Sequence, residues 1–305
     1  MDRIPHVLRH GLEKIKYSDY TTIRTGGTGF AYFPETVCDA VNIIRELHKY
    51  RLKYKVFGNF SNVIISDNGL AYPSVITTEM KNYCVNGEYI TAECGIKLPF
   101  ISKIAENNGL SGLEFACSIP ATLGGAVRNN AGAFGGEIFD VLESIYIMKN
   151  GRISELKKKD LSYSYHRLDL QCDIILSAVI KLKKTEKKKI SDQMKFNKEI
   201  RFKTQPAGFS AGSIFKKYAG LSAGKIIDDC GLKCMRVNGA VISSKHANFI
   251  INESNATSYD IYKLARFVKR YVFGETNIKL EEEVEYVGEF KNNNEVYRRL
   301  SYTYS

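Results

Sequence analysis

The sequence of 305 residues lacks the patterns that mark membrane proteins and exported proteins. No run approaches the roughly eighteen consecutive apolar residues that a membrane span requires. The first residues carry no apolar stretch of the secretory type. No internal repeat or low-complexity tract is visible. We therefore expect a cytoplasmic protein without a membrane partner.

Cysteine and histidine are present, but not in a metal-binding pattern. The seven cysteines are scattered and include no Cys-x-x-Cys pair, and Cys230 and Cys234 have no partner at zinc-like spacing. Such a set is typical of reduced thiols in a cytosolic protein. The five histidines show no ligand spacing, so no metal site is predicted.

Positive charge is abundant and unevenly placed. The formal net charge is +11, and residues 181–203 hold ten Lys or Arg residues against three acids. The spacing of the lysines in this segment is typical of a solvated helix face. Nucleic-acid binding is the less favoured interpretation of the segment. An anionic nucleotide substrate would use the general basicity equally well, and we expect no nucleic-acid partner.

Residues 108–137 form a glycine-rich and nearly uncharged stretch. Five glycines fall within thirteen residues of it, namely Gly124, Gly125, Gly132, Gly135 and Gly136. Glycine permits positive φ and close approach of another group, and successive backbone N–H groups freed in this way form a concave anion site. A surface loop or linker is the alternative, but linkers rarely carry so many apolar residues. The stretch predicts a loop that holds a pyrophosphate.

A second candidate for a phosphate site lies earlier in the chain. The pattern predicts a turn at Thr25, Gly26 and Gly27, a strand towards Pro34, and a helix over residues 36–50. A strand over residues 54–58 then leads into the turn GNFSN at residues 58–62 and the strand 63–65. A Gly/Ser/Asn turn at the carboxyl end of a strand in a β–α–β unit can cradle phosphate, although such a turn is weak evidence alone.

The remaining pattern is mixed helix and strand. We expect hairpins around residues 86–87 and 138–156, a helix over 97–108, a strand over 173–182 and a helix over 183–204. After Pro206 we expect helices over 223–230 and 258–273, with strands over 237–242, 248–251 and 278–287.

The segment GLSGLEFACSIPATLGGAVRNNAGAFGGEI closely resembles the signature of the UDP-N-acetylenolpyruvoylglucosamine reductases. The resemblance extends over residues 20–288 through SAGSIFKK, AGKIIDDCGLK, SKHANFIIN and IKLEEEVEYVG, in the shorter, second form of the family. It implies an α+β protein with an FAD-binding fold of the vanillyl-alcohol-oxidase type. The implied division is an FAD-binding subdomain over 1–74, to which a strand at 277–290 returns, a second over 75–205, and a substrate domain over 206–276.

The family resemblance also implies the cofactors and the reaction. Family members use FAD with NADPH, and a hydride passes through the flavin to the enol ether carbon of a UDP-linked amino sugar. We expect a monomer. The cofactor-binding positions implied are Thr25, Gly26, Gly27, Gly58, Asn59, Phe60, Ser61, Asn62, Ser118, Ile119, Pro120, Thr122, Gly124, Gly125, Asn130, Ala131 and Gly132.

Catalytic positions follow from the same resemblance. Ser213 in the SAGS segment matches the family's proton donor, and Glu283 matches a glutamate that assists at the substrate carboxylate. Tyr165 and Lys217 match substrate-binding positions. His166 stands where the family has an arginine that polarises the carboxylate, and Arg167 is a substitute only if the loop slips. Strand alternation would otherwise point Arg167 to the opposite face.

Departures from the family fall mostly on the substrate side. His166 replaces arginine, Lys217 replaces asparagine, and Glu285 replaces arginine, whereas on the FAD side Phe60 replaces a glycine. The sequence therefore leaves three hypotheses open. The protein is a working FAD- and NADPH-dependent reductase, a flavin-binding homologue with weak or lost activity, or an FAD enzyme that acts on a different anionic substrate.

Overall fold

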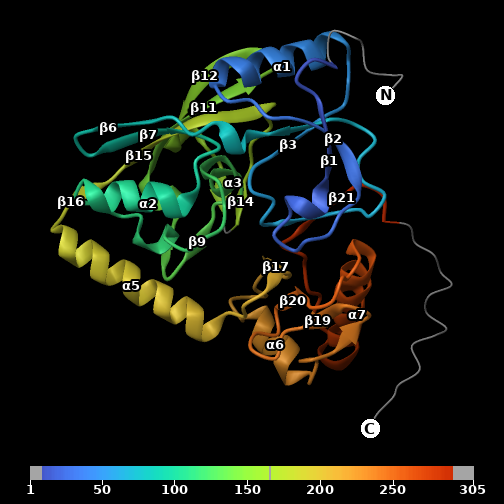
Figure 1. The fold of residues 1–305 in the computed structure, drawn as a ribbon. Helices are drawn as coiled ribbons and strands as arrows, with labels where there is room; N and C mark the ends of the chain where they lie inside the picture. The colour runs from blue at the N-terminus through green and yellow to red at the C-terminus, as the bar shows by residue number, and fades with distance from the viewer. Residues whose placement is uncertain (1–8, 165, 291–305) are drawn as a thin grey trace.

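The structure is a computed structural model, and it describes residues 9–164 and 166–290 (Figure 1). In these ranges, two sheets of four strands and one of five carry the fold, and separate two-stranded pairings accompany them. Within the described ranges, no helix combines the length and apolarity that crossing a membrane requires.

The N-terminal sheet has the strand order β1-β2-β5-β3, with β5 parallel to both of its neighbours. Its strands are β1 (Glu13–Lys16), β2 (Thr28–Tyr32), β3 (Lys55–Phe57) and β5 (Ser74–Ile76). Helix α1 (Val37–Lys49) begins at Thr36, whose hydroxyl accepts from the Asp39 amide while the Asp39 carboxylate accepts from the Thr36 amide. The predicted helix over 36–50 is confirmed.

The second sheet is antiparallel and has the order β12-β11-β15-β7-β6. Its strands are β6 (Tyr83–Asn86), β7 (Tyr89–Glu93), β11 (Leu142–Lys149), β12 (Arg152–Lys157) and β15 (Ile174–Lys181). Helices α2 (Leu98–Asn107) and α3 (Leu123–Arg128) bury their apolar residues in the same core. Both hairpins are confirmed, but residues 138–141 are helix α4 (Ile138–Val141), because Glu137 and Asp140 form a capping box.

Three short strand pairs accompany the second sheet. Helix α5 (Lys187–Thr204) then leads from the part of the chain that holds this sheet to the part that holds the third sheet (Figure 1). The pairs are β8 (Leu110–Ser111) with β16 (Lys183–Lys184), β9 (Gly132–Ala133) with β10 (Gly136–Glu137), and β13 (Tyr163–Ser164) with β14 (Arg167–Leu168). Because residues 183–184 pair with β8, the helix begins later than the expected 183.

The third sheet has the order β17-β20-β19-β18, and helices α6 (Ala223–Asp229) and α7 (Ser258–Thr276) pack around it. Its strands are β17 (Phe209–Ser213), β18 (Arg236–Val237), β19 (Ala240–Ile242) and β20 (Phe249–Asn252). The single strand expected over 237–242 is wrong. Asn238 adopts φ +49°, which turns the chain into a hairpin.

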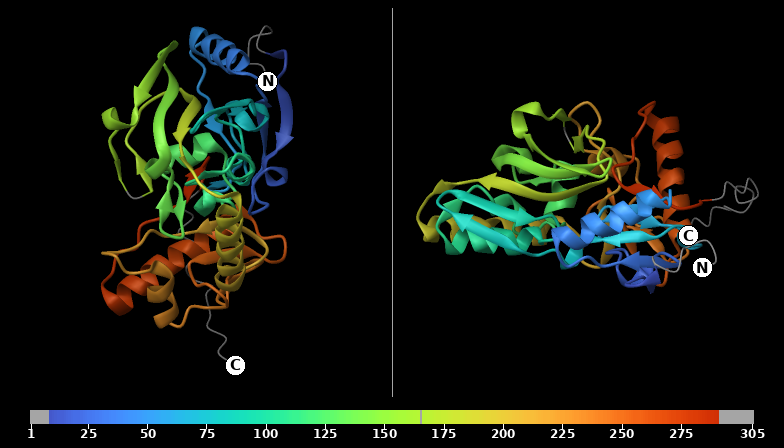
Figure 2. Two further views of the ribbon diagram at one scale, coloured as in Figure 1. Left: turned by 90° about the vertical axis from the view of Figure 1, so that its left-hand side faces the viewer. Right: turned by 90° about the horizontal axis from the view of Figure 1, so that it is seen from above.

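The chain finally returns to its N-terminal region. Strand β21 (Glu285–Val287) pairs in parallel with β4 (Val63–Ile65) (Figure 2). The strand expected over 278–287 is too long, because only its last three residues join this pairing. The residues before it instead run beside the segment that follows β17, with Phe215 opposite Glu282.

Phe60, which stands where the family has glycine, combines a strained backbone conformation with a buried ring. It adopts φ +51°, a left-handed conformation that a bulky residue rarely takes. Its ring is 4% exposed and stacks on Phe57 at 4.7 Å, with Tyr17 beside it. Aromatic burial therefore offsets the backbone strain at this turn.

Two substitutions at position 60 separate the two effects. Phe60→Ala removes the ring and should lower the free energy of unfolding by about 3–5 kcal/mol. Phe60→Gly loses the same ring but relieves the left-handed strain, so it should be more stable than the alanine variant by about 1 kcal/mol. Chemical denaturation of both variants tests this. An alanine variant as stable as the glycine variant would contradict the strain.

Candidate active site and cofactor-binding site

Backbone pairing brings the Ser213 segment and Glu283 together from distant parts of the chain. The Glu283 amide donates to the Ile214 carbonyl at 2.8 Å, and the Lys216 amide donates to the Glu281 carbonyl at 2.9 Å. Ser213 ends strand β17, one residue before Ile214. The serine and the carboxylate predicted to act together are thus placed on adjoining segments.

Asn248 holds the Ser213 segment in place, and the sequence analysis did not assign it a role. Its Oδ1 accepts from the Phe215 amide at 2.9 Å, and its Nδ2 donates to the Phe215 carbonyl at 2.8 Å. The Asn248 carbonyl also accepts from the Ile214 amide at 2.9 Å. In the sequence SKHANF, the asparagine directly before the apolar strand β20 could have indicated this structural role.

His166 reaches Glu283 from the tip of the β13–β14 hairpin. The His166 Nδ1 lies 3.6 Å from the Glu283 Oε1, and the two side chains are 17% and 18% exposed. His166 has φ +53° in this tight turn. Asn130 supports the hairpin, because its Nδ2 donates to the Ser164 carbonyl at 3.2 Å. Residue 166 therefore faces the site.

Burial favours the neutral forms of this pair. Burial raises the pKa of Glu283 to about 7, against the opposing effect of the Lys216 ammonium. Burial likewise lowers the pKa of His166, which Glu137 opposes and the charges of Lys217 and Lys216 reinforce. Below about pH 7 the proton of the pair therefore resides on the carboxyl group, close to two ammonium groups.

The other predicted catalytic and substrate positions are Arg167, Lys217 and Tyr165, and they differ in where they lie. Arg167 is turned to solvent, and its guanidinium pairs with Asp169 at 3.3 Å rather than with the Glu283 site. Lys217 is exposed, and its charge acts on His166. Tyr165 lies outside the described residues. Arg167 begins strand β14 and pairs with Asp169, so it does not take the place of His166 beside Glu283.

The turn at residues 58–62 touches the other two predicted site segments. A Cβ on Gly58 would lie 2.1 Å from the Thr122 Oγ1, so only glycine allows this approach. The Asn59 Nδ2 donates to the Pro120 carbonyl at 2.8 Å. The Asn62 Nδ2 donates to the Glu283 carbonyl at 3.2 Å. The candidate cofactor segments and Glu283 therefore meet at one turn.

Three buried hydroxyls in these segments lack partners, which fits a polar ligand. The Thr25 Oγ1, Ser118 Oγ and Thr122 Oγ1 atoms are buried and make no hydrogen bond to any residue that the structure describes. Buried polar groups in folded proteins almost always have partners. These residues thus fit the FAD that the FAD-type sequence pattern implies.

Several predicted phosphate-binding glycines serve packing in the structure. The Gly124 amide donates to the Cys94 carbonyl at 2.8 Å, and a Cβ on Gly124 would lie 2.8 Å from the Cys94 Cβ. A Cβ on Gly27 would lie 2.1 Å from the Asp67 carbonyl oxygen, and one on Gly132 would lie 2.7 Å from that of Gly136. The Gly124 amide is therefore unavailable to a phosphate, contrary to the simplest interpretation of the glycine-rich stretch.

The remaining predicted cofactor positions have mixed roles. The Ala131 carbonyl accepts from the Ile138 amide at 3.0 Å, and Ile119 packs against the hydrophobic core of the second sheet. Gly26 has φ +122°, a conformation that favours glycine. Gly125 faces Thr122, since a Cβ there would lie 3.5 Å from the Thr122 Oγ1. Ser61 is half-buried in the turn at residues 58–62.

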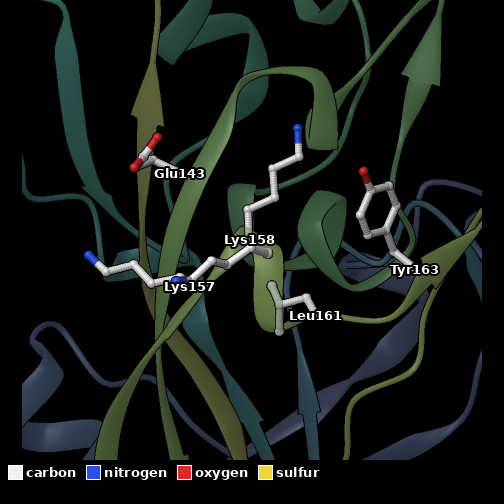
Figure 3. A pocket seen from close by; sticks show the side chains of 6 residues that line it. Glu143, Lys157, Lys158, Leu161 and Tyr163 are labelled. Carbon is white, nitrogen blue, oxygen red and sulfur yellow. The ribbon is translucent and has the colours of Figure 1, made fainter.

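One pocket is lined by none of the predicted site residues. It encloses about 670 Å³ beside strands β11 and β12 (Figure 3). Its lining consists of Glu143, Lys157, Lys158, Lys159, Leu161 and Tyr163. None of these is a predicted site residue. Among the described residues, no cluster of three His, Cys, Asp or Glu could hold a metal ion.

The buried carboxyl group makes stability depend on pH. Because the pKa of Glu283 is about 7 in the folded protein, against an ordinary value of 4.5, ionisation opposes folding. The folded state then holds its proton more tightly, and stability should fall as pH rises from about 4.5 to 7. In wild type this ionisation should lower the free energy of unfolding by up to roughly 3 kcal/mol, and Glu283→Gln should remove that decrease.

Chemical denaturation at about pH 5 and pH 8 measures the effect. Comparing wild type with the glutamine variant cancels the ionisable groups that both share. Glu281→Gln is the matched control, because the Glu281 side chain is 76% exposed. Equal pH dependence in wild type and Glu283→Gln would show that Glu283 ionises normally.

Comparison with known proteins gives a consistent result. Residues 29–157 match the FAD binding domain family, and residues 205–287 match the family described as UDP-N-acetylenolpyruvoylglucosamine reductase, C-terminal domain. The UDP-N-acetylenolpyruvoylglucosamine reductase of Caldicellulosiruptor bescii is 38% identical over 291 residues, covering 92% of this chain and 93% of that protein. That of Pediococcus pentosaceus is 37% identical over 285 residues, covering 92% of this chain and 95% of that protein.

A solved structure agrees with these matches. The crystal structure of UDP-N-acetylenolpyruvylglucosamine reductase (MurB) from Thermus caldophilus has a TM-score of 0.81 and 33% identity, over 91% of this chain and 99% of that chain. The predicted fold class, an FAD-binding fold followed by a C-terminal α+β domain, is confirmed.

Proposed function

The chain belongs to the UDP-N-acetylenolpyruvoylglucosamine reductase family, and from this premise we propose that it is an FAD- and NADPH-dependent reductase. It converts UDP-N-acetylglucosamine enolpyruvate into UDP-N-acetylmuramate in peptidoglycan precursor synthesis. One observation carries the proposal at the level of the site. The Ser213 segment, Glu283 and His166 converge from three distant segments, beside the turn that contacts Thr122.

The residues proposed to hold FAD are those whose polar groups lack partners. Thr25, Ser118 and Thr122 present buried hydroxyls, and Gly58 allows the chain to close against Thr122. When bound, FAD reduced by NADPH supplies a hydride to the enol ether carbon of the substrate. We further propose the division into two FAD-binding subdomains and a substrate domain, because the hydrophobic core forms separate clusters.

Ser213 and Glu283 have complementary roles in this proposal. The Ser213 hydroxyl delivers a proton to the carbon next to the one that is reduced. Glu283, with a pKa of about 7, retains a proton near neutral pH and can donate a hydrogen bond to the substrate carboxylate as charge develops there. His166 contacts Glu283 at 3.6 Å and holds that carboxyl group in position.

Positive charge near this pair supports an anionic substrate. The Lys216 ammonium acts on both Glu283 and His166, and Lys217 acts on His166. Lysine charges in a partly buried site attract a carboxylate more strongly than they would in water. They therefore supply part of the positive charge that an arginine at position 166 would contribute.

The histidine at position 166 supports two alternative functions. It is the observation that favours a flavin-binding homologue with weak or lost reductase activity, or an enzyme for a different anionic substrate. Histidine carries only part of a positive charge near neutral pH, whereas arginine is always charged.

Anaerobic flavin spectroscopy tests the proposed reaction. NADPH should bleach the bound flavin, and UDP-N-acetylglucosamine enolpyruvate should restore its absorbance. Ser213→Ala should bleach equally but recover about 10²- to 10⁴-fold more slowly, because only the proton donor is lost. Bleaching without recovery in the wild type would favour the other two functions, and a screen of anionic substrates would separate them.

His166→Arg tests whether the native site is impaired. Since Lys216 and Lys217 already place positive charge beside Glu283, the arginine should change kcat by less than about tenfold. It should also lower the pKa of Glu283 and shift the pH profile of kcat downwards. A much larger gain in kcat would indicate that the natural histidine has weakened the enzyme.

A further inference from the structure

Helix α5 carries seven Lys or Arg residues against two acids, and the proposed reaction gives it no role. Its inner face is nevertheless fixed against the candidate cofactor segment (Figure 1). The Asn197 Nδ2 donates to the Glu114 carbonyl at 2.9 Å, and the Cys117 thiol donates to the Met194 carbonyl at 3.6 Å. Asn197 is 2% exposed and Met194 is 5% exposed. The helix therefore lies directly against the residues that precede Ser118.

Arg201 continues this inner face beyond the packed residues. It lies four residues, about one turn, after Asn197, so its side chain leaves the helix on the same side. The side chain is half-buried, and burial lowers the pKa of Arg201, with the Cys117 thiol as the ionisable group nearby. A guanidinium remains charged at neutral pH even so.

No acceptor in the described part of the chain takes up this charge. Arg201 forms no ion pair and no side-chain hydrogen bond there, whereas Glu114 already accepts from the Gly112 amide at 2.8 Å. By contrast, Lys195 and Lys203 on the same helix are exposed to water. A half-buried guanidinium without an acceptor is costly unless a ligand supplies one.

A second polar group beside Cys117 has the same deficiency. The Ser118 Oγ is buried and, apart from its neighbour Cys117, has no hydrogen-bond partner among the described residues. The Arg201 charge acts on the same Cys117 thiol, so a hydroxyl donor and a guanidinium both belong to the surroundings of Cys117. Phosphate oxygens match both, because a guanidinium binds them in bidentate fashion.

We propose that Arg201 of helix α5 and the Ser118 hydroxyl together bind a phosphate of a nucleotide diphosphate. This inference rests on the proposed function, which supplies two sources of that group, the pyrophosphate of FAD and the diphosphate of the UDP sugar. It gives the basic helix a role through one inward-facing arginine, while its lysines remain in water.

Binding measurements on Arg201→Met test the assignment. Apoprotein is titrated with FAD and followed by flavin fluorescence, and FAD-loaded protein is titrated with UDP by calorimetry. Dissociation constants should rise about 10- to 100-fold for whichever nucleotide contacts Arg201, as expected for loss of one charge-assisted contact. Arg201→Lys, which keeps the charge but not the fork, should give an intermediate loss.

Lys195→Met is the matched control, because it removes one exposed charge from the same helix and should change neither constant more than twofold. A rise for FAD alone assigns the pyrophosphate of the cofactor, and a rise for UDP alone assigns the substrate diphosphate. Dissociation constants of Arg201→Met and Arg201→Lys that both stay within twofold of wild type, for FAD and for UDP, overturn the proposal.

The same measurements separate this inference from the proposed reaction. A wild type that binds FAD and UDP but fails to reduce the enolpyruvyl nucleotide would refute the reaction, and the Arg201 variants would still decide the phosphate site. A wild type that binds neither nucleotide would refute both. Thermal unfolding of each apoprotein shows that the variants are folded before they are titrated.

Discussion

The contact between the turn at residues 58–62 and two distant segments is the constraint on which the rest of the site depends. Gly58 lies so close to Thr122 that no side chain fits between them, and Asn62 binds the Glu283 carbonyl. The parallel pairing of β4 and β21 follows directly after this turn. One short turn thereby joins the candidate cofactor segments to the Glu283 carboxyl group.

Burial then sets the chemistry at the other side of that turn. Burial raises the pKa of Glu283 to about 7 and lowers the pKa of His166, so it favours the neutral form of both side chains. A neutral acid can donate a hydrogen bond where an ionised one can only accept. Lysine charges from the segment after Ser213 complete the local field. The proposed anionic substrate would thus meet lysine charges beside a carboxyl group and an imidazole whose neutral forms burial favours.

The glycine-rich stretch shows how a correct family pattern can rest on a mistaken physical reason. Its glycines were expected to free backbone amides for a pyrophosphate, yet the Gly124 amide binds Cys94 and the residue packs against it. Close packing of α3 against the second sheet accounts for that position. Among the residues that the structure describes, the buried groups of this stretch left without partners are instead hydroxyls, those of Ser118 and Thr122. Which polar atoms remain for a ligand depends on how the backbone is satisfied, and no local pattern records that.

The sequence alone determined the family, the mixed fold class and the long elements, because helix caps, hairpin turns and hydrophobic periodicity are local properties. Helix α1 and the β11–β12 hairpin are examples. Only the tertiary structure decided that His166 meets Glu283, that Arg167 faces solvent, and that Asn248 holds the Ser213 segment. These contacts join residues far apart in the chain, so their geometry exists only once the sheets have packed.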